Sequence, residues 1–321
     1  MAAAVPDPRP ELSVVITCYR EERTIGAFHR RLRDTLVELG QPFEIVYVDD
    51  GSDDTTAQHL HRIFEEDEHV AAVVELFRNS GQTAAVTAGC AETAGRRLVF
   101  LDSDLQLDPE DLPSLVKASD EGADLVAGFR ADRADTALRS LFSRLGNAAL
   151  RTLAGSRLRD LGCTFRIVDA RLVRAFEFGP RKVIRMGDLV AAAGRVAEVP
   201  VRHHPRAHGR SGWSAAGLLA YGADNLVVLS RRPFQALSIA CFVLGGLVVA
   251  RLAVGLIWPG RVLDEVTNGL ILNVLALGLV VLLGVSAAIG EYVIRSFLAL
   301  QGAPAYVVRT VQRRGAGGGV R

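Results

Sequence analysis

Two long apolar stretches near the carboxyl-terminal end constrain this chain more than any other feature. The first extends from residue 233 to 258 and is apolar apart from Gln235 and Arg251. The second, GLILNVLALGLVVLLGVSAAIG, occupies residues 269–290. A helix needs roughly 20 residues to cross a hydrocarbon layer of about 30 Å. Both stretches are long enough, so we predict two transmembrane helices, the alternative being a pair of buried core helices.

Flanking charges predict the orientation of these two spans. Arg231 and Arg232 precede the first span, and the segment after Gln301 is basic and lacks acidic residues. By the positive-inside rule, both termini are expected in the cytosol. The amino-terminal sequence MAAAVPDPRPEL lacks the basic start and apolar run of a secretory signal, so the region before the spans is expected to stay inside the cell. We therefore predict a multi-pass protein of the cell (inner or plasma) membrane.

The region before the spans alternates between apolar runs and helical patterns. Nearly continuous apolar runs at 12–19, 43–50, 71–77, 97–104 and 123–130 predict strands, and residues 24–39, 55–66 and 83–94 have helical spacing. This alternation predicts an α/β fold with a doubly wound, mostly parallel sheet covered on both faces.

These patterns divide the chain into six segments. We predict a disordered amino terminus at 1–10, a cytosolic α/β domain at 11–212, an interfacial amphipathic helix at 213–232, spans at 233–258 and 269–290, and a basic cytosolic tail at 291–321. Gly245 and Gly246 would let the spans pack closely, so a homo-oligomer formed through the membrane helices is a further expectation.

Charge and cysteine content exclude several functional classes. The formal net charge is +1 and the basic residues form no cluster, so the sequence lacks the footprint of a nucleic-acid-binding protein. The four cysteines are Cys18, Cys90, Cys163 and Cys241, and no pair has CxxC spacing. We therefore expect neither a zinc site nor a disulfide framework, as suits a reducing cytosol.

Acidic residues gather where the predicted strands end. The strand at 97–104 ends in Asp102 and Asp104, which alternation along a strand would place on the same side, with Ser103 opposite. Two adjacent carboxylates repel each other unless a cation lies between them, and Mg²⁺ or Mn²⁺ prefers such oxygen ligands. The sequence therefore predicts a cation that holds a diphosphate at this point.

The other strand ends add further polar groups. Asp49 and Asp50 end the strand at 43–50, and Tyr19 and Glu21 follow the first strand. Ligands of doubly wound sheets bind outside the carboxyl ends of the strands, so one crevice is expected to receive an aromatic ring and several carboxylates.

At this point the chain resembles the family-2 glycosyltransferases with a GT-A (Rossmann-like) fold. The resemblance rests on SVVITCYREE, EIVYVDDGSDDTT, LFRNSGQTAAVTAGCAETAG, LVFLDSDLQLDPEDLP and GFR, and continues through DLGCTFRIVDARLV, VPVRHHPRAHGRSGWS, the two spans and GEYVIRSFLALQGAPAYVV. Within the family it is most similar to the polyprenyl-phosphate branch, which includes dolichol-phosphate mannose synthases and bacterial undecaprenyl-phosphate sugar transferases.

The resemblance implies roles for individual residues on the donor side. The donor-nucleotide set comprises Tyr19, Glu21, Asp49, Asp50, Asp102 and Ser103. The metal and donor diphosphate would be held by Asp102, Asp104 and Gln106. Asp160 resembles the family's acid near the reacting sugar carbon, and together with Asp104 and Arg130 it completes the implied catalytic set. Asp188 is an alternative acid, since saccharide-acceptor members often carry a catalytic aspartate near this position.

The resemblance also implies a site for the acceptor's phosphate. Its residues would be Arg130, Arg139, Ser143, Arg206, Arg210 and Ser211. The last three lie in the loop RAHGRSGWS, which resembles a mobile loop that closes over the donor. The chain departs from the family pattern at Thr17, Arg20 and Gly212, where proline, asparagine and lysine are usual, so Arg206 or Arg210 must supply the missing charge.

The predicted function is a membrane-bound, metal-dependent, inverting transfer of a sugar from a nucleotide sugar to polyprenyl phosphate. A UDP-sugar is favoured and a GDP-sugar is an alternative. The competing hypotheses are a glycosyltransferase that acts on a glycan or glycolipid, and a non-catalytic membrane scaffold that retains the fold.

Overall fold

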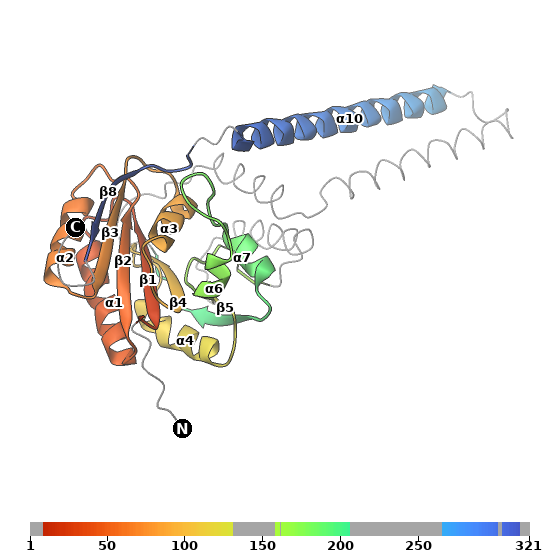
Figure 1. The fold of residues 1–321 in the computed structure, drawn as a ribbon. Helices are drawn as coiled ribbons and strands as arrows, with labels where there is room; N and C mark the ends of the chain where they lie inside the picture. The colour runs from red at the N-terminus through yellow and green to blue at the C-terminus, as the bar shows by residue number, and fades with distance from the viewer. Residues whose placement is uncertain (1–8, 131–157, 161, 206–264, 301–303, 315–321) are drawn as a thin grey trace. The chain divides into compact units, whose positions relative to one another are not determined.

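The computed structural model describes residues 9–130, 158–160, 162–205, 265–300 and 304–314 (Figure 1). The chain forms two compact units. One comprises Met1–Ala220 with Pro304–Arg321, and the other comprises Tyr221–Ala303. The predicted interfacial helix at 213–232 and the predicted span at 233–258 lie outside the described residues.

The first unit is built on an eight-stranded sheet. The strands are β1 (Leu12–Cys18), β2 (Phe43–Asp49), β3 (Val70–Leu76), β4 (Arg97–Asp102), β5 (Leu125–Arg130), β6 (Arg166–Asp169), β7 (Val196–Val201) and β8 (Val308–Arg313). Their spatial order is β7-β5-β6-β4-β1-β2-β3-β8. Strands β4, β1, β2 and β3 are parallel neighbours, and β5 is parallel to β7. Strand β6 runs antiparallel between β4 and β5, and β8 runs antiparallel to β3. The sheet is therefore mixed.

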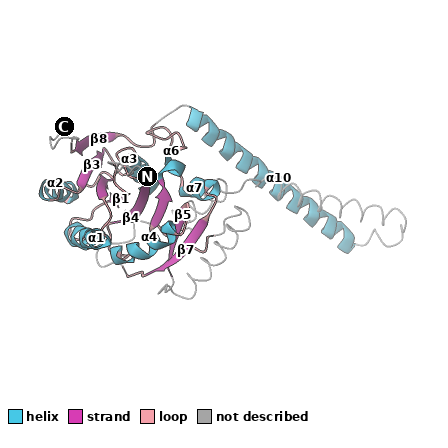
Figure 2. Cartoon of the chain, turned by 60° about the horizontal axis from the view of Figure 1, so that its bottom comes forward, coloured by secondary structure: helices cyan, strands magenta, loops and turns pink. Residues whose placement is uncertain are grey.

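Helices cover both faces of this sheet, as Figure 2 shows. Helices α1 (Ile25–Leu39), α2 (Thr56–Glu66) and α4 (Leu112–Asp120) share one hydrophobic cluster with alternate residues of β1, including Leu12 and Val14. Helices α3 (Gln82–Cys90), α6 (Ala170–Arg174) and α7 (Met186–Ala192) pack into a second cluster with Val15. A short 3₁₀ helix, η1 (Pro109–Asp111), precedes α4. Since both faces are buried, the central strands are apolar along their length, and this pattern made them predictable.

The carboxyl-terminal strand β8 was not expected from the sequence, where 291–321 was assigned to a basic tail. Thr310 and Gln312 of β8 reach Glu75 of β3 and His61 of α2, respectively. Tyr306, 3% exposed, joins the second hydrophobic cluster. The strand VRTVQR is polar and half exposed, so it lacks the apolar run that identified the central strands. Its pairing with β3 brings residues after the second unit back into the first.

The second unit is described through helix α10 (Glu265–Leu300), which contains the predicted span at 269–290. Large apolar side chains along this helix are exposed, including Leu275, Leu282 and Phe297. Among the described helices, none satisfies the combined length and hydropathy requirement of a membrane-spanning helix.

Candidate active site

The predicted donor residues meet at the carboxyl edge of the central strands. Register pairs Thr17 of β1 with Asp102 of β4, and Cys18 of β1 with Asp49 of β2. Asp49 and Asp102 therefore lie on either side of the end of β1, where Tyr19 follows. The parallel pairing thus brings together residues that are far apart in the sequence.

Asp102 is held by neutral hydrogen-bond donors. Thr17 Oγ1 donates to Asp102 Oδ1 at 2.6 Å, and Gln82 Nε2 lies 2.6 Å from Oδ1 and 2.7 Å from Oδ2. The side chain of Thr164 also hydrogen-bonds to this carboxylate. Burial raises the pKa of Asp102, and the neighbouring charge of Asp104 raises it further.

Asp104 lies beyond the end of β4, because the strand ends at Asp102. The expectation that alternation along one strand places both carboxylates on the same side therefore does not apply. The chain turns at Leu105, whose φ of 58° is left-handed, and Asp104 Oδ1 accepts a hydrogen bond from Gln106 N at 3.0 Å. A turn, rather than strand alternation, brings the two carboxylates close enough to interact.

The oxygen ligands available at this edge of the sheet suit a hard divalent cation. Asp102 and Asp104 offer carboxylate oxygens. The negative charge of Asp104 acts on Asp102, and the hydrogen-bond donors to Asp102 in the described chain are neutral. No group of three or more His, Cys, Asp or Glu side chains within the described ranges could hold a metal alone. A pair of carboxylates suits an ion such as Mg²⁺, which is usually bound by one or two carboxylates together with waters and substrate phosphate oxygens.

Asp49 and Asp50 have different surroundings. Asp49 accepts hydrogen bonds from the backbone and hydroxyl of Ser52. Asp50 Oδ1 accepts from Ser80 N at 2.7 Å, and Oδ2 accepts from Gly81 N at 2.9 Å. Burial raises the pKa of Asp50 to about 6. Asp50 thus ties the connection that leads into α3 to the end of β2.

Around Tyr19, polar contacts link the loop after β1 to the loop after β2. Tyr19 is 37% exposed, and the Arg20 guanidinium lies 5.2 Å from its ring centroid. Arg20 also forms an ion pair with Asp53, with Arg20 Nε 2.6 Å from Asp53 Oδ1. Glu21 accepts a hydrogen bond from Thr24. Ser103, by contrast, is 1% exposed and donates to the Thr17 carbonyl at 3.1 Å, so its hydroxyl is engaged within the fold.

Arg130 and Asp160 form a close ion pair beside β5. Arg130 Nε lies 2.7 Å from Asp160 Oδ2, and its NH2 group lies 2.9 Å from Oδ1. The exposed fractions of the two side chains are 19% and 8%. Asp160 Oδ1 also accepts a hydrogen bond from Gly162 N at 3.2 Å. The structure therefore joins two residues that the sequence had assigned to different roles.

The remaining predicted site residues divide into two groups. Asp188 lies exposed in the first turn of α7. The acceptor residues outside the described part of the chain are Arg139, Ser143, Arg206, Arg210 and Ser211.

Sequence reasoning missed Gln82 and Thr164 and treated Thr17 only as a departure from the family pattern. All three contact Asp102. A polar residue at the start of the helix after a strand was the available signal for Gln82, because such helix starts face the carboxyl edge of the sheet.

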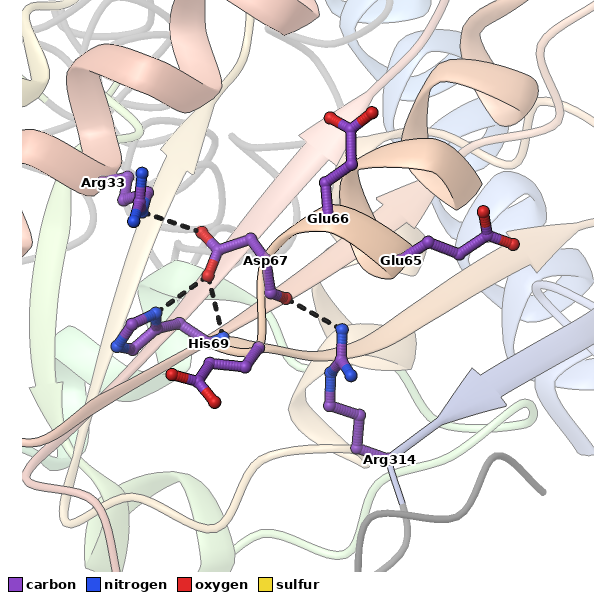
Figure 3. Close-up of a pocket in the computed structure, with 7 residues that line it drawn as sticks. Arg33, Glu65, Glu66, Asp67, His69 and Arg314 are labelled. Carbon is purple, nitrogen blue, oxygen red and sulfur yellow. Dashed lines mark hydrogen bonds and ion pairs between the residues drawn. The ribbon is translucent and has the colours of Figure 1, made fainter.

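A separate polar cavity of about 290 Å³ lies near the amino-terminal end of β3. Figure 3 shows Arg33 and His69 pointing toward Asp67, while Glu65 and Glu66 point away. Arg314 donates to the Asp67 carbonyl at 3.0 Å. None of the predicted site residues lines this cavity, which joins α1 and α2 to the segment after β8.

Comparison with known proteins identifies relatives along almost the entire chain. The family model described as "Glycosyl transferase family 2" matches residues 13–178. An undecaprenyl-phosphate 4-deoxy-4-formamido-L-arabinose transferase of Pseudomonas aeruginosa is 35% identical over 320 residues, covering 96% of this chain and 92% of that protein. A protein of the same name from Edwardsiella ictaluri is 31% identical, covering 94% of each chain.

Solved structures share the fold. Glucosyl-3-phosphoglycerate synthase from Mycobacterium tuberculosis, in complex with Mn²⁺ and UDP-glucose, matches with a TM-score of 0.50 and 23% identity. The match covers 69% of this chain and 79% of that one. A mycobacterial protein matches with a TM-score of 0.50 and 24% identity, over 69% of this chain and 75% of that one.

Proposed function

This chain belongs to glycosyltransferase family 2, and from that premise we propose that it transfers a sugar from a nucleotide sugar to a polyprenyl phosphate at the membrane. The observation that carries the proposal is the group of carboxylates at the carboxyl edge of the sheet, where Asp49 and Asp102 flank the end of β1 and Asp104 follows. The acceptor is inferred from relatives that are named as undecaprenyl-phosphate transferases and match the chain over 96% of its length.

On the donor side, Tyr19, Glu21 and Asp49 would contact the base and ribose. Asp50 supports this pocket through the backbone that it holds at Ser80 and Gly81. A Mg²⁺ or Mn²⁺ ion held by Asp102, Asp104 and Gln106 would supply neutralisation of the charge that develops on the leaving diphosphate. A UDP-sugar is the favoured donor, and a GDP-sugar is the alternative.

On the acceptor side, Arg130 would receive the phosphate. Asp160 fixes its guanidinium through contacts of 2.7 and 2.9 Å, so the cation is held rigidly at the end of β5. Asp160 acts here by positioning Arg130, and no proton transfer to it is required. Arg139, Ser143, Arg206, Arg210 and Ser211 complete the proposed phosphate site.

The proposed step is a direct displacement. A phosphate oxygen of the acceptor forms a bond to the anomeric carbon, and the bond from that carbon to the donor diphosphate breaks. The electron pair leaves with the nucleoside diphosphate, and the anomeric centre is inverted. A phosphate monoester has a second pKa of about 6, so it is already an anionic nucleophile at pH 7 and needs no strong base.

Membrane attachment places the site close to its lipid acceptor. We propose spans at 233–258 and 269–290, with both termini in the cytosol, an interfacial helix at 213–232, and packing between subunits through Gly245 and Gly246. The support is the apolar sequence of both stretches, together with the exposed apolar side chains of α10 such as Leu282.

The test uses membranes that contain the protein, Mg²⁺ or Mn²⁺, polyprenyl phosphate and labelled UDP- and GDP-sugars. The panel includes the UDP derivative of 4-deoxy-4-formamido-L-arabinose, the sugar in the names of the relatives. We expect acid-labile label in the lipid extract with one donor, and its loss in Asp104→Ala. Asp34→Ala, which changes an exposed carboxylate on α1, is the control and should retain activity.

Other outcomes of this assay favour the alternative functions. Label that appears only in a glycan or glycolipid fraction would identify a saccharide acceptor. Folded protein that transfers no label from any donor would support the scaffold hypothesis. Near-normal turnover by Asp104→Ala would contradict the assignment of the metal and diphosphate site.

A further inference from the structure

Gln82, the first residue of α3, contacts the carboxylate of Asp102. Its side-chain nitrogen lies 2.6 Å from Asp102 Oδ1 and 2.7 Å from Oδ2. The amide therefore faces both oxygens of one carboxylate. Gln82 begins α3 and Asp102 ends β4, the strand that follows α3 in the chain, so this contact joins the start of one element to the end of the next.

The backbone that carries Gln82 is itself held in place. Asp50 of the β2 end accepts hydrogen bonds from Ser80 N and Gly81 N, directly before α3. Gly81 has a φ of 88°, which side-chain-bearing residues rarely adopt. Further along α3, Gly89 packs so closely on Val15 that an added Cβ would lie 2.4 Å from Val15 Cγ1. The position of the Gln82 side chain is therefore set by strands β1 and β2.

Chemistry explains why an amide suits this position. A cationic side chain would form an ion pair with Asp102 and compete with a metal ion for its charge. An amide or a hydroxyl can orient the carboxylate through hydrogen bonds without adding a positive charge. Gln82, Thr17 and Thr164 are all neutral donors to Asp102, so they restrict its rotation and leave its negative charge available.

We propose that Gln82 is a positioning residue that fixes the carboxylate of Asp102 in the orientation needed to hold the cation and diphosphate of the donor, with Thr17 as its partner in this role. The proposal rests on the proposed function, because it assigns Asp102 and Asp104 to the donor's cation. Partners that orient metal ligands typically contribute about 10- to 100-fold to metal affinity or activity. A loss in that range is expected when Gln82 is truncated.

The test measures Mn²⁺ binding to the full-length, detergent-solubilised chain in the presence of UDP. The electron paramagnetic resonance signal of free Mn²⁺ reports how much Mn²⁺ stays unbound. Gln82→Ala should bind Mn²⁺ about 10- to 100-fold more weakly than the unmodified chain. The control is Gln41→Ala, which removes a glutamine that contacts Arg97 near the opposite edge of the sheet. Its Mn²⁺ affinity should be unchanged.

A second pair of variants tests the orientation of the Asp102 carboxylate separately from the folding of the chain. Thr17→Ser keeps a hydroxyl beside Asp102, whereas Thr17→Val keeps the shape and removes the donor. We expect Thr17→Ser to bind Mn²⁺ with UDP nearly as the unmodified chain does, and Thr17→Val to bind more weakly at an unchanged melting temperature. If Gln82→Ala fails to fold, this pair still decides the question.

Three results would overturn the inference, and they differ in what they imply for the proposed function. Unchanged Mn²⁺ affinity in folded Gln82→Ala, with binding lost in Asp104→Ala, would remove the positioning role and leave the proposed function intact. Equal affinity of Thr17→Ser and Thr17→Val would have the same meaning. Failure of the unmodified chain to bind Mn²⁺ with UDP would contradict the metal-dependent function itself, and the inference with it.

Discussion

Gly51 provides a quantitative test of how the donor site is built. It follows Asp50 with a φ of 68°, and an added Cβ would lie 2.3 Å from the backbone carbon of Arg78. Gly40, at the end of α1, has the same φ of 68° but nothing within 4 Å of an added Cβ. The two glycines therefore share the backbone conformation and differ in the space around them.

The expected free energies of unfolding follow from this difference. Gly40→Ala should cost about 1 to 2 kcal/mol, the penalty for a left-handed conformation in a residue with a side chain. Gly51→Ala should cost about 1 to 3 kcal/mol more, because the overlap forces backbone to move. For a unit of this size, each kcal/mol lowers the melting temperature by about 2 to 4 °C. Gly51→Ala should therefore melt about 2 to 12 °C below Gly40→Ala.

Differential scanning calorimetry of the two variants in detergent measures this difference, and hydrogen exchange in β2 and β3 assigns the transition to the first unit. Movement at Arg78 should also disturb the backbone that Asp50 holds, so Gly51→Ala should have a raised KM for the donor. Equal melting temperatures and equal donor KM values for the two variants would refute the close packing of these two loops.

Three further predictions concern other parts of the protein. Arg130→Ala removes the guanidinium that contacts both oxygens of the buried Asp160 carboxylate and should cost about 3 kcal/mol of stability in denaturant unfolding, together with most transferase activity; unchanged stability would contradict the ion pair. Burial lowers the pKa of His61, but hydrogen bonds to Gln312 and Glu75 raise it overall, and the charge of Glu65 acts in the same direction. Protonated His61 should therefore stabilise β8 fully below the unfolded His pKa of about 6.5, and this stabilisation should be lost as pH rises through the folded pKa. The backbone amides of β8 should exchange faster at pH 8.5 than at pH 6 after correction for intrinsic rates. An identical pH response in His61→Gln would exclude His61 as the cause. Chelation with EDTA should abolish transfer, and Mn²⁺ should restore it.

The central fold was predictable because parallel strands buried on both faces are apolar throughout. The run at 43–50, for example, corresponds to β2 at Phe43–Asp49, and the helical pattern at 24–39 corresponds to α1 at Ile25–Leu39. Strands β6, β7 and β8 escaped prediction: β6 is short, and β7 and β8 lie at the two edges of the sheet, where most of their side chains are partly or fully exposed. Their formation depends on pairing partners that are distant in sequence.

The candidate site was predictable where a residue type alone indicates chemistry. Paired carboxylates at strand ends identified Asp102 and Asp104 as a candidate cation site, although a turn rather than the strand places Asp104. Glutamine as a residue type indicates no such chemistry, and the position of Gln82 at a helix start does not reveal its partner, so its role was inferred from its contacts with both Asp102 oxygens. The resemblance placed Arg130 and Asp160 in one catalytic set, but their direct ion pair is known only from the structure.

The mass of the lipid product shows whether the acceptor is a lipid phosphate. Purified protein would be incubated with its accepted nucleotide sugar, Mn²⁺ and either undecaprenyl phosphate or undecaprenol, and the lipids analysed by mass spectrometry. We predict that undecaprenyl phosphate gains the mass of one sugar residue, with release of one nucleoside diphosphate, and that undecaprenol is unchanged. Glycosylation of undecaprenol to the same extent, or sugar found only on a non-lipid acceptor, would contradict the claim that the acceptor is a lipid phosphate.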